Sequence, residues 1–278
     1  MTTTGVAAGV PYVAVPPSTP RPDAPVVLVW HLLDSPRTER AMAAALPLAD
    51  LDAWRVYLGL PLSGSRLPEG GLDALFARAM EDVVRNAHRP IALGAVEELP
   101  ASYAALREQL GLGTGPVALV GGSLGAAVAQ LVLLEAARPL GLDIVAAVLV
   151  SPVVQLREVL AAIGRELGEY VLDDDTAGFA DRLDFVARAG EFPAAGQPAV
   201  RIVVGSEDDL EGFLAPAQRL RDELAVRYED PDRLDLVTVA GMGHGFAEEP
   251  GLEPAPQTEC AEVVDGLAVA WLARFLDS

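Results

Sequence analysis

A serine stands between two glycines in the run VALVGGSLGA, which covers residues 117–126. An apolar run typical of a strand precedes the serine, and an Ala-rich stretch typical of a helix follows it. Gly121 and Gly125 leave room for a tight strand-to-helix turn, which exposes the hydroxyl of Ser123 at the start of the helix. Free N–H groups and the helix dipole favour a developing negative charge there. The run therefore predicts a nucleophilic serine, although the same pentapeptide also occurs in plain glycine turns.

A histidine that could deprotonate this serine follows a later strand. The chain has three histidines, and His244 lies in the run Gly-Met-Gly-His-Gly-Phe, directly after a predicted strand at 234–239. The flanking glycines predict an exposed loop at the carboxyl end of that strand, from which an imidazole can reach Ser123. We predict that His244 is the general base.

Three acidic residues after the preceding strand could orient the histidine. They are Glu207, Asp208 and Asp209, and they follow a strand-like run that ends near Gly205. The chain order of nucleophile, acid and histidine is the one expected for a parallel α/β sheet with such a turn. Asp208 fits a Gly-x-x-Asp turn best, Asp209 is the second candidate and Glu207 the third.

These residues together predict acyl transfer through a covalent intermediate. His244 would take the proton of Ser123 as the hydroxyl attacks a carbonyl, and Asp208 would fix the tautomer and stabilise the imidazolium. Water would then release the acyl group. Two backbone N–H groups must hold the oxyanion: that of Leu124, and one from the loop after the strand at 26–30. Loss of one such donor typically costs about 2.7–4 kcal/mol of transition-state stabilisation.

The elements that must position these side chains alternate along the chain. Short apolar runs and longer helical patterns follow one another, which predicts an α/β fold with a mostly parallel, doubly wound sheet and helices on both faces. We find no repeat and no dividing linker, so residues 1–278 are expected to form a single domain. Strands are predicted at 12–15, 26–30, 54–58, from 117, and at 144–150, 200–204 and 234–239; helices at 36–46, 72–86, 98–110, after the serine to about 137, and at 156–172, 176–189, 215–228 and 261–275.

A long and mostly helical insertion separates two of the predicted strands. Such an excursion usually lies over the carboxyl ends of the strands, where ligands bind in these sheets. We predict that residues 154–189 form a small helical cap. The alternative is a pair of ordinary crossover helices.

Four features, taken in order, resemble the α/β-hydrolase superfamily over nearly the whole chain. They are the Trp30-His31 strand end, the turn at Ser123, the Gly205–Asp208 turn and the Gly243-His244-Gly245 loop.

The resemblance implies that His31 occupies the histidine of the family's His-Gly oxyanion loop and that Leu33 supplies the second N–H donor. Here Leu32 stands where the family has glycine, so Leu32 is the alternative donor. The chain also lacks the His-Gly-Gly-Gly form of that loop, which argues against the esterases that accept esters of tertiary alcohols.

We expect structural roles for the other two histidines, His31 and His88. His31 is expected to hydrogen-bond the backbone of its loop, and His88, after a predicted helix, to be a surface or C-capping residue. Asp34, Arg37 and Arg40 are expected at an exposed helix start, with substrate contact as the alternative.

Composition excludes several kinds of partner and cofactor. With 40 acidic residues against 20 basic ones, all arginine, the net charge of -20 argues against nucleic acid and anionic membranes as partners. A single cysteine allows no internal disulfide and no thiolate metal cluster, and Asp173-Asp174-Asp175 is better explained as a helix N-cap than as a metal site. No metal and no other cofactor are expected, because the Gly-rich run 111–115 precedes a strand instead of linking strand to helix.

The N-terminal residues lack the basic and apolar regions of a signal peptide, and no apolar run reaches membrane-spanning length. We therefore expect a cytoplasmic protein, either a monomer or a homodimer, that acts on a small-molecule acyl substrate.

The leading hypothesis is a carboxylesterase for small or medium acyl chains, since residues 154–189 are rich in aliphatic side chains and poor in aromatic ones. Thioesterase, lactonase, amide or peptide hydrolase and carbon–carbon hydrolase are alternatives with the same triad. A non-catalytic ligand-binding protein or scaffold is the alternative from another class, because a fold does not fix a function.

Overall fold

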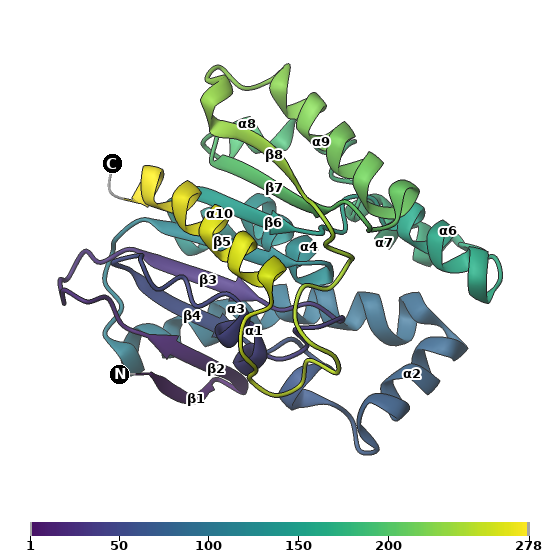
Figure 1. The fold of residues 1–278 in the computed structure, drawn as a ribbon, viewed down its shortest axis with the longest axis horizontal. Coiled ribbons are helices and arrows are strands. Elements are labelled where there is room, and N and C mark those ends of the chain that lie inside the picture. Colours follow the sequence, from purple (N-terminus) through teal and green to yellow (C-terminus); the bar gives the residue numbers. More distant parts are fainter. Residues whose placement is uncertain (1, 277–278) are drawn as a thin grey trace.

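The computed structural model describes residues 2–276 and is built around one eight-stranded sheet (Figure 1). The order across the sheet is β1-β2-β4-β3-β5-β6-β7-β8. The pairs β1–β2 and β2–β4 are antiparallel, and every pair from β4 to β8 is parallel. The predicted mostly parallel sheet is confirmed. The strands are β1 (Thr3–Ala7), β2 (Val10–Val15), β3 (Val26–Trp30), β4 (Trp54–Leu58), β5 (Val117–Gly122), β6 (Ile144–Val150), β7 (Ala199–Gly205) and β8 (Leu234–Val239).

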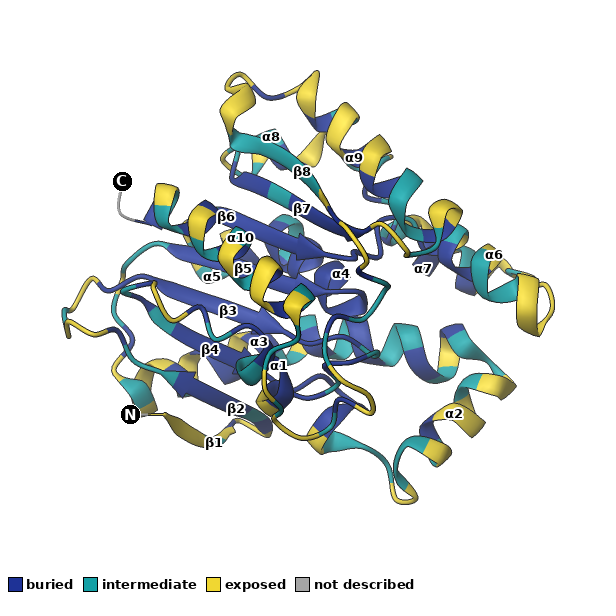
Figure 2. Ribbon diagram, in the orientation of Figure 1, coloured by how far each residue is buried: buried dark blue, intermediate teal, exposed yellow. Residues whose placement is uncertain are grey.

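The central strands are apolar because both of their faces are covered. All five residues of β3 are buried, and they divide between two cores. Leu28 and Trp30 contribute to one core, while Val27 and Val29 contribute to the other. A strand buried on both faces reads as a continuous hydrophobic run without polar alternation, as these do (Figure 2).

Helices cover the two faces of the sheet. The helices α1 (Glu39–Ala45) and α10 (Glu259–Leu276) lie together on one face, where α10 crosses in front of the strands in Figure 1. The other face is covered by α3 (Arg89–Leu110), α4 (Leu124–Leu131) and α9 (Ala215–Ala225), whose buried residues share one core. This arrangement is the doubly wound architecture.

Some element boundaries differ from the predicted ones. The helix predicted from residue 36 begins at Glu39, because the Thr38 side chain caps it by accepting from the Ala41 N–H. The helix predicted from residue 98 begins nine residues earlier, at Arg89, and this long helix, α3, contains Pro100 in its interior. Strand β1 was missed by the sequence analysis.

The remaining elements are short. They are η1 (Gly64–Arg66), α2 (Gly71–Glu81), the π-helical turns η2 (Val84–His88), η3 (Val132–Ala136) and η4 (Leu210–Leu214), and α5 (Ala137–Leu140), α6 (Leu156–Leu167), α7 (Asp174–Arg182), α8 (Glu191–Ala194) and η5 (Pro231–Arg233).

The insertion between β6 and β7 contains α6, α7 and α8. Helix α6 packs on η4, and α7 begins with a capping box in which Asp173 and Thr176 each bond the other's backbone N–H. The acidic run is thus an N-cap, as predicted. Among residues 2–276, no helix is both long enough and apolar enough to cross a membrane.

Candidate active site

Ser123 occupies the sharp turn between β5 and α4. Its φ of +50° and ψ of −119° lie in a region that residues other than glycine rarely adopt. A Cβ on Gly121 would overlap the carbonyl oxygen of Gly125, and a Cβ on Gly125 would overlap that of His31. Glycine is therefore required on both sides of the serine, and the strained turn presents the hydroxyl at the carboxyl edge of the sheet.

The structure brings the three predicted triad residues together. His244 Nε2 lies 2.8 Å from Ser123 Oγ, and His244 Nδ1 lies 2.9 Å from Asp208 Oδ2. Asp208 follows β7 and His244 follows β8, so neighbouring strand ends carry the two side chains. A Cβ on Gly205 would overlap the carbonyl oxygen of Met242, so the two strand-end loops are in close contact.

The neighbouring acids are engaged elsewhere. The Asp209 carboxylate accepts from the Gly212 N–H at 2.7 Å and pairs with Arg165, while Glu207 is exposed. The side chain of Asp208 is almost fully buried, and its second oxygen accepts from the Asp209 N–H at 2.7 Å. Of the three candidates, Asp208 is the one that contacts the histidine.

Two neighbouring backbone N–H groups in the loop after β3 differ in their hydrogen bonds. The Leu32 N–H donates to the carbonyl of Pro36 at 3.2 Å, whereas within residues 2–276 the Leu33 N–H has no acceptor. The N–H of Leu124 stands in the first turn of α4 and has no partner within that helix. Of the two leucines, Leu33 thus has the amide that is available to a bound oxyanion.

Gly122 explains how leucine replaces the glycine expected after His31. A Cβ on Gly122 would overlap the side chain of Leu32, so the absence of a side chain on the strand provides the space that Leu32 fills. The sequence contains both Gly122 and Leu32, but the sequence analysis did not connect the small residue with the large one.

His31 holds the loop by both ring nitrogens. Its Nδ1 lies 2.7 Å from the Leu32 carbonyl oxygen, and its Nε2 accepts from the Leu60 N–H at 3.1 Å. Burial lowers the pKa of His31 to about 4, so the ring is neutral at pH 7, with Nδ1–H as the donor. The predicted structural role of His31 agrees with these contacts.

Two side chains lie beside the imidazole of His244: Phe213, which the sequence analysis did not name, and Asp34, for which it gave substrate contact as the alternative. The Asp34 carboxylate lies 3.8 Å from His244 Nε2 and is half-exposed, and the Phe213 ring lies 4.0 Å from the imidazole, centroid to centroid. The expectation of an exposed helix start is wrong for Asp34, because α1 begins only at Glu39. Arg37 is largely buried and donates to the Leu33 carbonyl, while Arg40 remains exposed.

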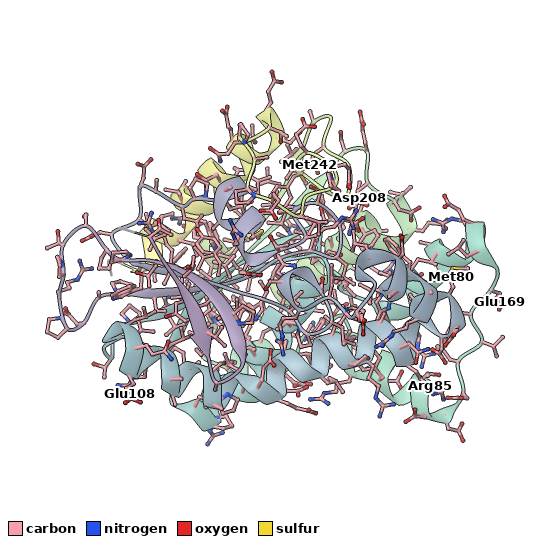
Figure 3. All side chains as sticks on the ribbon, turned by 90° about the horizontal axis from the view of Figure 1, so that it is seen from below. Met80, Arg85, Glu108, Glu169, Asp208 and Met242 are labelled. Carbon is pink, nitrogen blue, oxygen red and sulfur yellow. The ribbon has the colours of Figure 1, made fainter. Side chains whose placement is uncertain are left out.

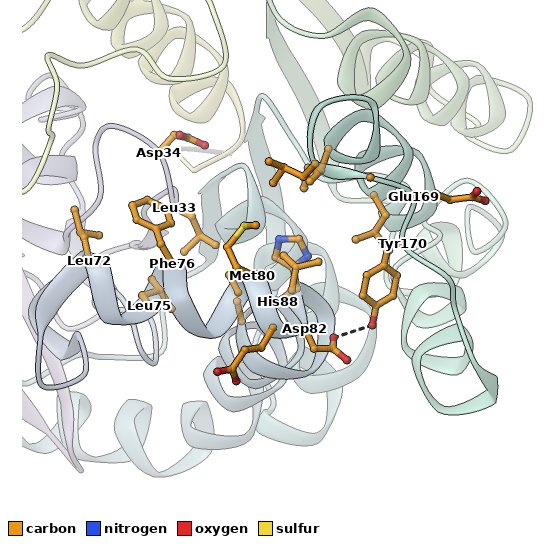
Figure 4. Close-up of a pocket in the computed structure, with 18 of the residues that line it drawn as sticks. Leu33, Asp34, Leu72, Leu75, Phe76, Met80, Asp82, His88, Glu169 and Tyr170 are labelled. Carbon is orange, nitrogen blue, oxygen red and sulfur yellow. Dashed lines mark hydrogen bonds between the residues drawn. The ribbon is translucent and has the colours of Figure 1, made fainter.

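A cavity of about 640 Å³ opens next to this site (Figure 4). Leu33 and Asp34 line it, together with one wall from α2 and η2 and another from α6 with the turn that follows it. Figure 3 shows Met80 and Glu169, one from each wall, at the same end of the molecule, far from Glu108 near the end of α3. Most of the lining side chains are apolar.

His88 lines this cavity, so its prediction as a surface or C-capping residue is wrong. The π-helical turn η2 ends at His88, but the chain continues from it directly into α3, so the helical path is not broken there. Burial lowers the pKa of His88 to about 4, so this imidazole is also neutral at pH 7. Its Nδ1 is buried and has no hydrogen-bond partner in the described part of the chain.

A metal site is not formed by the side chains that the structure describes. No group of three or more histidine, cysteine, aspartate or glutamate side chains among residues 2–276 is arranged to hold an ion.

Comparison with known proteins identifies the fold. No protein-family model matches the sequence, and no curated protein matches it either. Solved structures do match: TT1662 from Thermus thermophilus is 24% identical, with a TM-score of 0.67 over 100% of this chain and 98% of its own. Dienelactone hydrolase from Anabaena variabilis is 16% identical, with a TM-score of 0.56 over 99% and 97% of the two chains. Carboxyl esterase 2 from the fungus Tuber melanosporum is 16% identical, with a TM-score of 0.57 over 99% and 86%.

Proposed function

From the α/β-hydrolase fold of this chain and the geometry of its site, we propose that the protein is a serine hydrolase that cleaves carboxylic esters of small or medium acyl chains. The observation that carries the proposal is the unbroken path of two hydrogen bonds from Ser123 through His244 to Asp208. A serine with only a structural role on a strained turn would not require a hydrogen-bonded histidine–aspartate pair. The fold shared with esterases and with dienelactone hydrolase supports the assignment.

The reaction follows from the positions of these groups. The Ser123 oxygen attacks the ester carbonyl and gives its proton to His244 Nε2, while the N–H groups of Leu33 and Leu124 receive the oxyanion. The C–O bond to the alcohol then breaks, and the histidine passes the proton to the departing alkoxide. Water repeats the sequence on the acyl-enzyme, which yields the carboxylic acid and free Ser123.

The neighbouring cavity supports an apolar chain as part of the substrate. Leu33 contributes both its N–H to the reaction centre and its side chain to the lining of the cavity, so a chain that leaves the carbonyl can continue into it. In this proposal residues 154–189 act as a cap only in part: α6 is one wall, and α2, outside the predicted cap, is the other.

Hydrolysis of p-nitrophenyl esters from acetate to dodecanoate tests the proposal. We expect turnover across the series with the highest kcat/KM at a medium chain, because burial of each additional methylene in the apolar cavity favours binding until the cavity is filled. Thioesters and anilides of the same acids serve as comparisons. Turnover of either of these without turnover of the esters would contradict the ester assignment and leave the nucleophile in place.

Asp34 is expected to disfavour acidic substrates. Replacement by asparagine should raise kcat/KM for p-nitrophenyl hydrogen succinate roughly two- to fivefold relative to p-nitrophenyl butyrate, because a half-exposed carboxylate beside His244 repels a second one. The gain should shrink in 1 M salt, which screens exposed charges. Asp143→Asn, at the exposed residue that precedes β6, makes the same change in net charge and should leave the ratio unaltered. An equal response of both variants would remove Asp34 from the substrate's surroundings.

A further inference from the structure

One ring nitrogen of His244 has two oxygen neighbours. Its Nε2 lies 2.8 Å from Ser123 Oγ and 3.8 Å from Asp34 Oδ2. The first distance is that of a hydrogen bond, whereas the second is too long for one. A gap of this length suits a bridging water, which can lie about 2.8 Å from each of the two atoms. The Asp34 side chain is half-exposed and lines the cavity next to the triad, so water can reach it (Figure 4).

The position of Asp34 relative to His244 is set by contacts between the residues that follow each of them. The Phe246 N–H donates to the Ser35 carbonyl at 3.0 Å, which joins the loop of Asp34 to the loop of His244. A Cβ on Gly245 would lie only 2.8 Å from the same carbonyl oxygen, so the two loops are in close contact. The fold therefore holds the carboxylate and the imidazole at this spacing.

Arg37 holds the other oxygen of the Asp34 carboxylate. The guanidinium is largely buried, lies 3.6 Å from Asp34 Oδ1 and also pairs with Glu249 at 3.1 Å. Its attraction for Oδ1 favours the orientation in which Oδ2 is the oxygen nearer to His244. A carboxylate has no hydrogen to donate, so any partner placed between Oδ2 and the imidazole must donate to Asp34.

A water molecule in this position is oriented for attack on an acyl group. One of its hydrogens points to His244 Nε2 and the other to Asp34, which leaves an oxygen lone pair for the acyl carbon. As the water oxygen bonds that carbon, the first proton passes to Nε2 and then to Ser123 Oγ, whose bond to the carbon breaks. The second hydrogen stays on the carboxylic acid product. An alcohol has a single O–H, so it can donate to the histidine only.

We propose that Asp34 is a catalytic residue of deacylation, which binds the hydrolytic water and directs the acyl group to water in preference to alcohols. The inference rests on the proposed function, because it requires an acyl group on Ser123. Asp34 has no part in acylation, since the departing alkoxide takes its proton from His244. The repulsion of acidic substrates by Asp34 is a separate effect, because kcat/KM for a p-nitrophenyl ester reports acylation.

The test measures how the acyl-enzyme divides between water and methanol. p-Nitrophenyl butyrate is cleaved in buffer that contains methanol, and methyl butyrate and butyric acid are quantified at early times by gas chromatography. We expect Asp34→Ala to raise the ratio of methyl ester to acid roughly three- to tenfold, the value of one hydrogen bond. Asp34→Asn keeps the size of the side chain and a carbonyl acceptor, so its ratio should lie between those of the wild type and the alanine variant. Asp143→Ala removes an exposed carboxylate before β6 and should leave the ratio unchanged.

The kinetics of p-nitrophenol release provide a readout that a structural defect would not reproduce. In Asp34→Ala, slower attack by water should let the acyl-enzyme accumulate. We therefore expect kcat and KM to fall together while kcat/KM changes little, and rapid mixing should show a burst of p-nitrophenol. A displaced loop would instead lower kcat/KM, because acylation uses the Leu33 amide of the same loop.

The outcomes separate this inference from the proposed function. A ratio of methyl ester to acid that is the same in Asp34→Ala and the wild type, while the ester is still cleaved, would overturn the inference and leave the proposed function standing. A fall in kcat/KM without a burst would overturn it as well, because Asp34 would then act in acylation. If butyryl thioesters or anilides are cleaved and the p-nitrophenyl ester is not, the ester assignment fails, and the product ratio measured on that acyl donor still decides the role of Asp34. If none of these donors is cleaved, both fail.

Discussion

Replacement of Ser123 by alanine is expected to lower kcat for p-nitrophenyl ester hydrolysis by about 10⁶-fold. The variant loses the atom that attacks the carbonyl, and His244 Nε2 loses its hydrogen-bond partner at 2.8 Å. Steady-state kinetics on the optimal ester of the series gives the value. The melting temperature of the variant should stay close to that of the wild type, because alanine meets the same backbone strain at φ +50° and removes only one hydroxyl.

A fluorophosphonate probe gives an independent readout of the same residue. The wild type should form a covalent adduct that peptide mass spectrometry locates at Ser123, and Ser123→Ala should form none. An alanine variant with substantial remaining turnover, or an adduct at another residue, would remove Ser123 from the chemistry. Absence of an adduct on the wild type, under conditions that label a known serine hydrolase, would favour the non-catalytic alternative.

The second large effect is expected at Asp208. Replacement by asparagine should lower kcat by about 10⁴-fold, because the amide favours the wrong tautomer of His244 and cannot stabilise the imidazolium. The measurement is kcat on the same ester, with a folding check by circular dichroism.

Asp209→Asn is the matched control for this substitution. Asp209 holds the start of η4 by accepting from Glu211 N–H and Gly212 N–H and does not contact the histidine. Its replacement should keep kcat within a few-fold, since asparagine also accepts in a cap. The reverse pattern, with activity lost at Asp209 and kept at Asp208, would contradict the assignment of the acid.

The sheet and the positions of the three triad residues could be predicted because their signals are local. A strand buried on both faces is a continuous apolar run, and β3, β4, β6 and β8 have the predicted bounds. The chemistry-bearing residues follow directly on strands, and parallel strands bring their carboxyl ends to one edge. The glycines on either side of Ser123 and His244 indicated which strand ends carry the candidate catalytic side chains.

The residues around the triad could not be predicted in the same way, because their positions depend on the tertiary packing of loops and helix faces. Asp34 reaches His244 from a loop whose path is set by contacts with segments more than 200 residues away, such as the Ser35 hydroxyl donating to the Glu248 carbonyl. Phe213 and His88 reach the site and its cavity on helical turns that carry no motif. The second cavity wall, α2, was read correctly as a helix, but periodicity does not show what a helix faces.

The proposed triad and the proposed oxyanion donor Leu33 depend on different strand pairings. Ser123, Asp208 and His244 follow β5, β7 and β8, which belong to four strands that neighbour one another both in the chain and in the sheet. Leu33 follows β3, and its place beside Ser123 depends on the parallel pairing of β3 with β5, in which Val26 lies opposite Val117. Pairing across so long a stretch of chain has a high entropic cost and forms slowly. The three triad residues therefore depend on the strands β5 to β8, whereas the amide of Leu33 depends in addition on the pairing of β3 with β5.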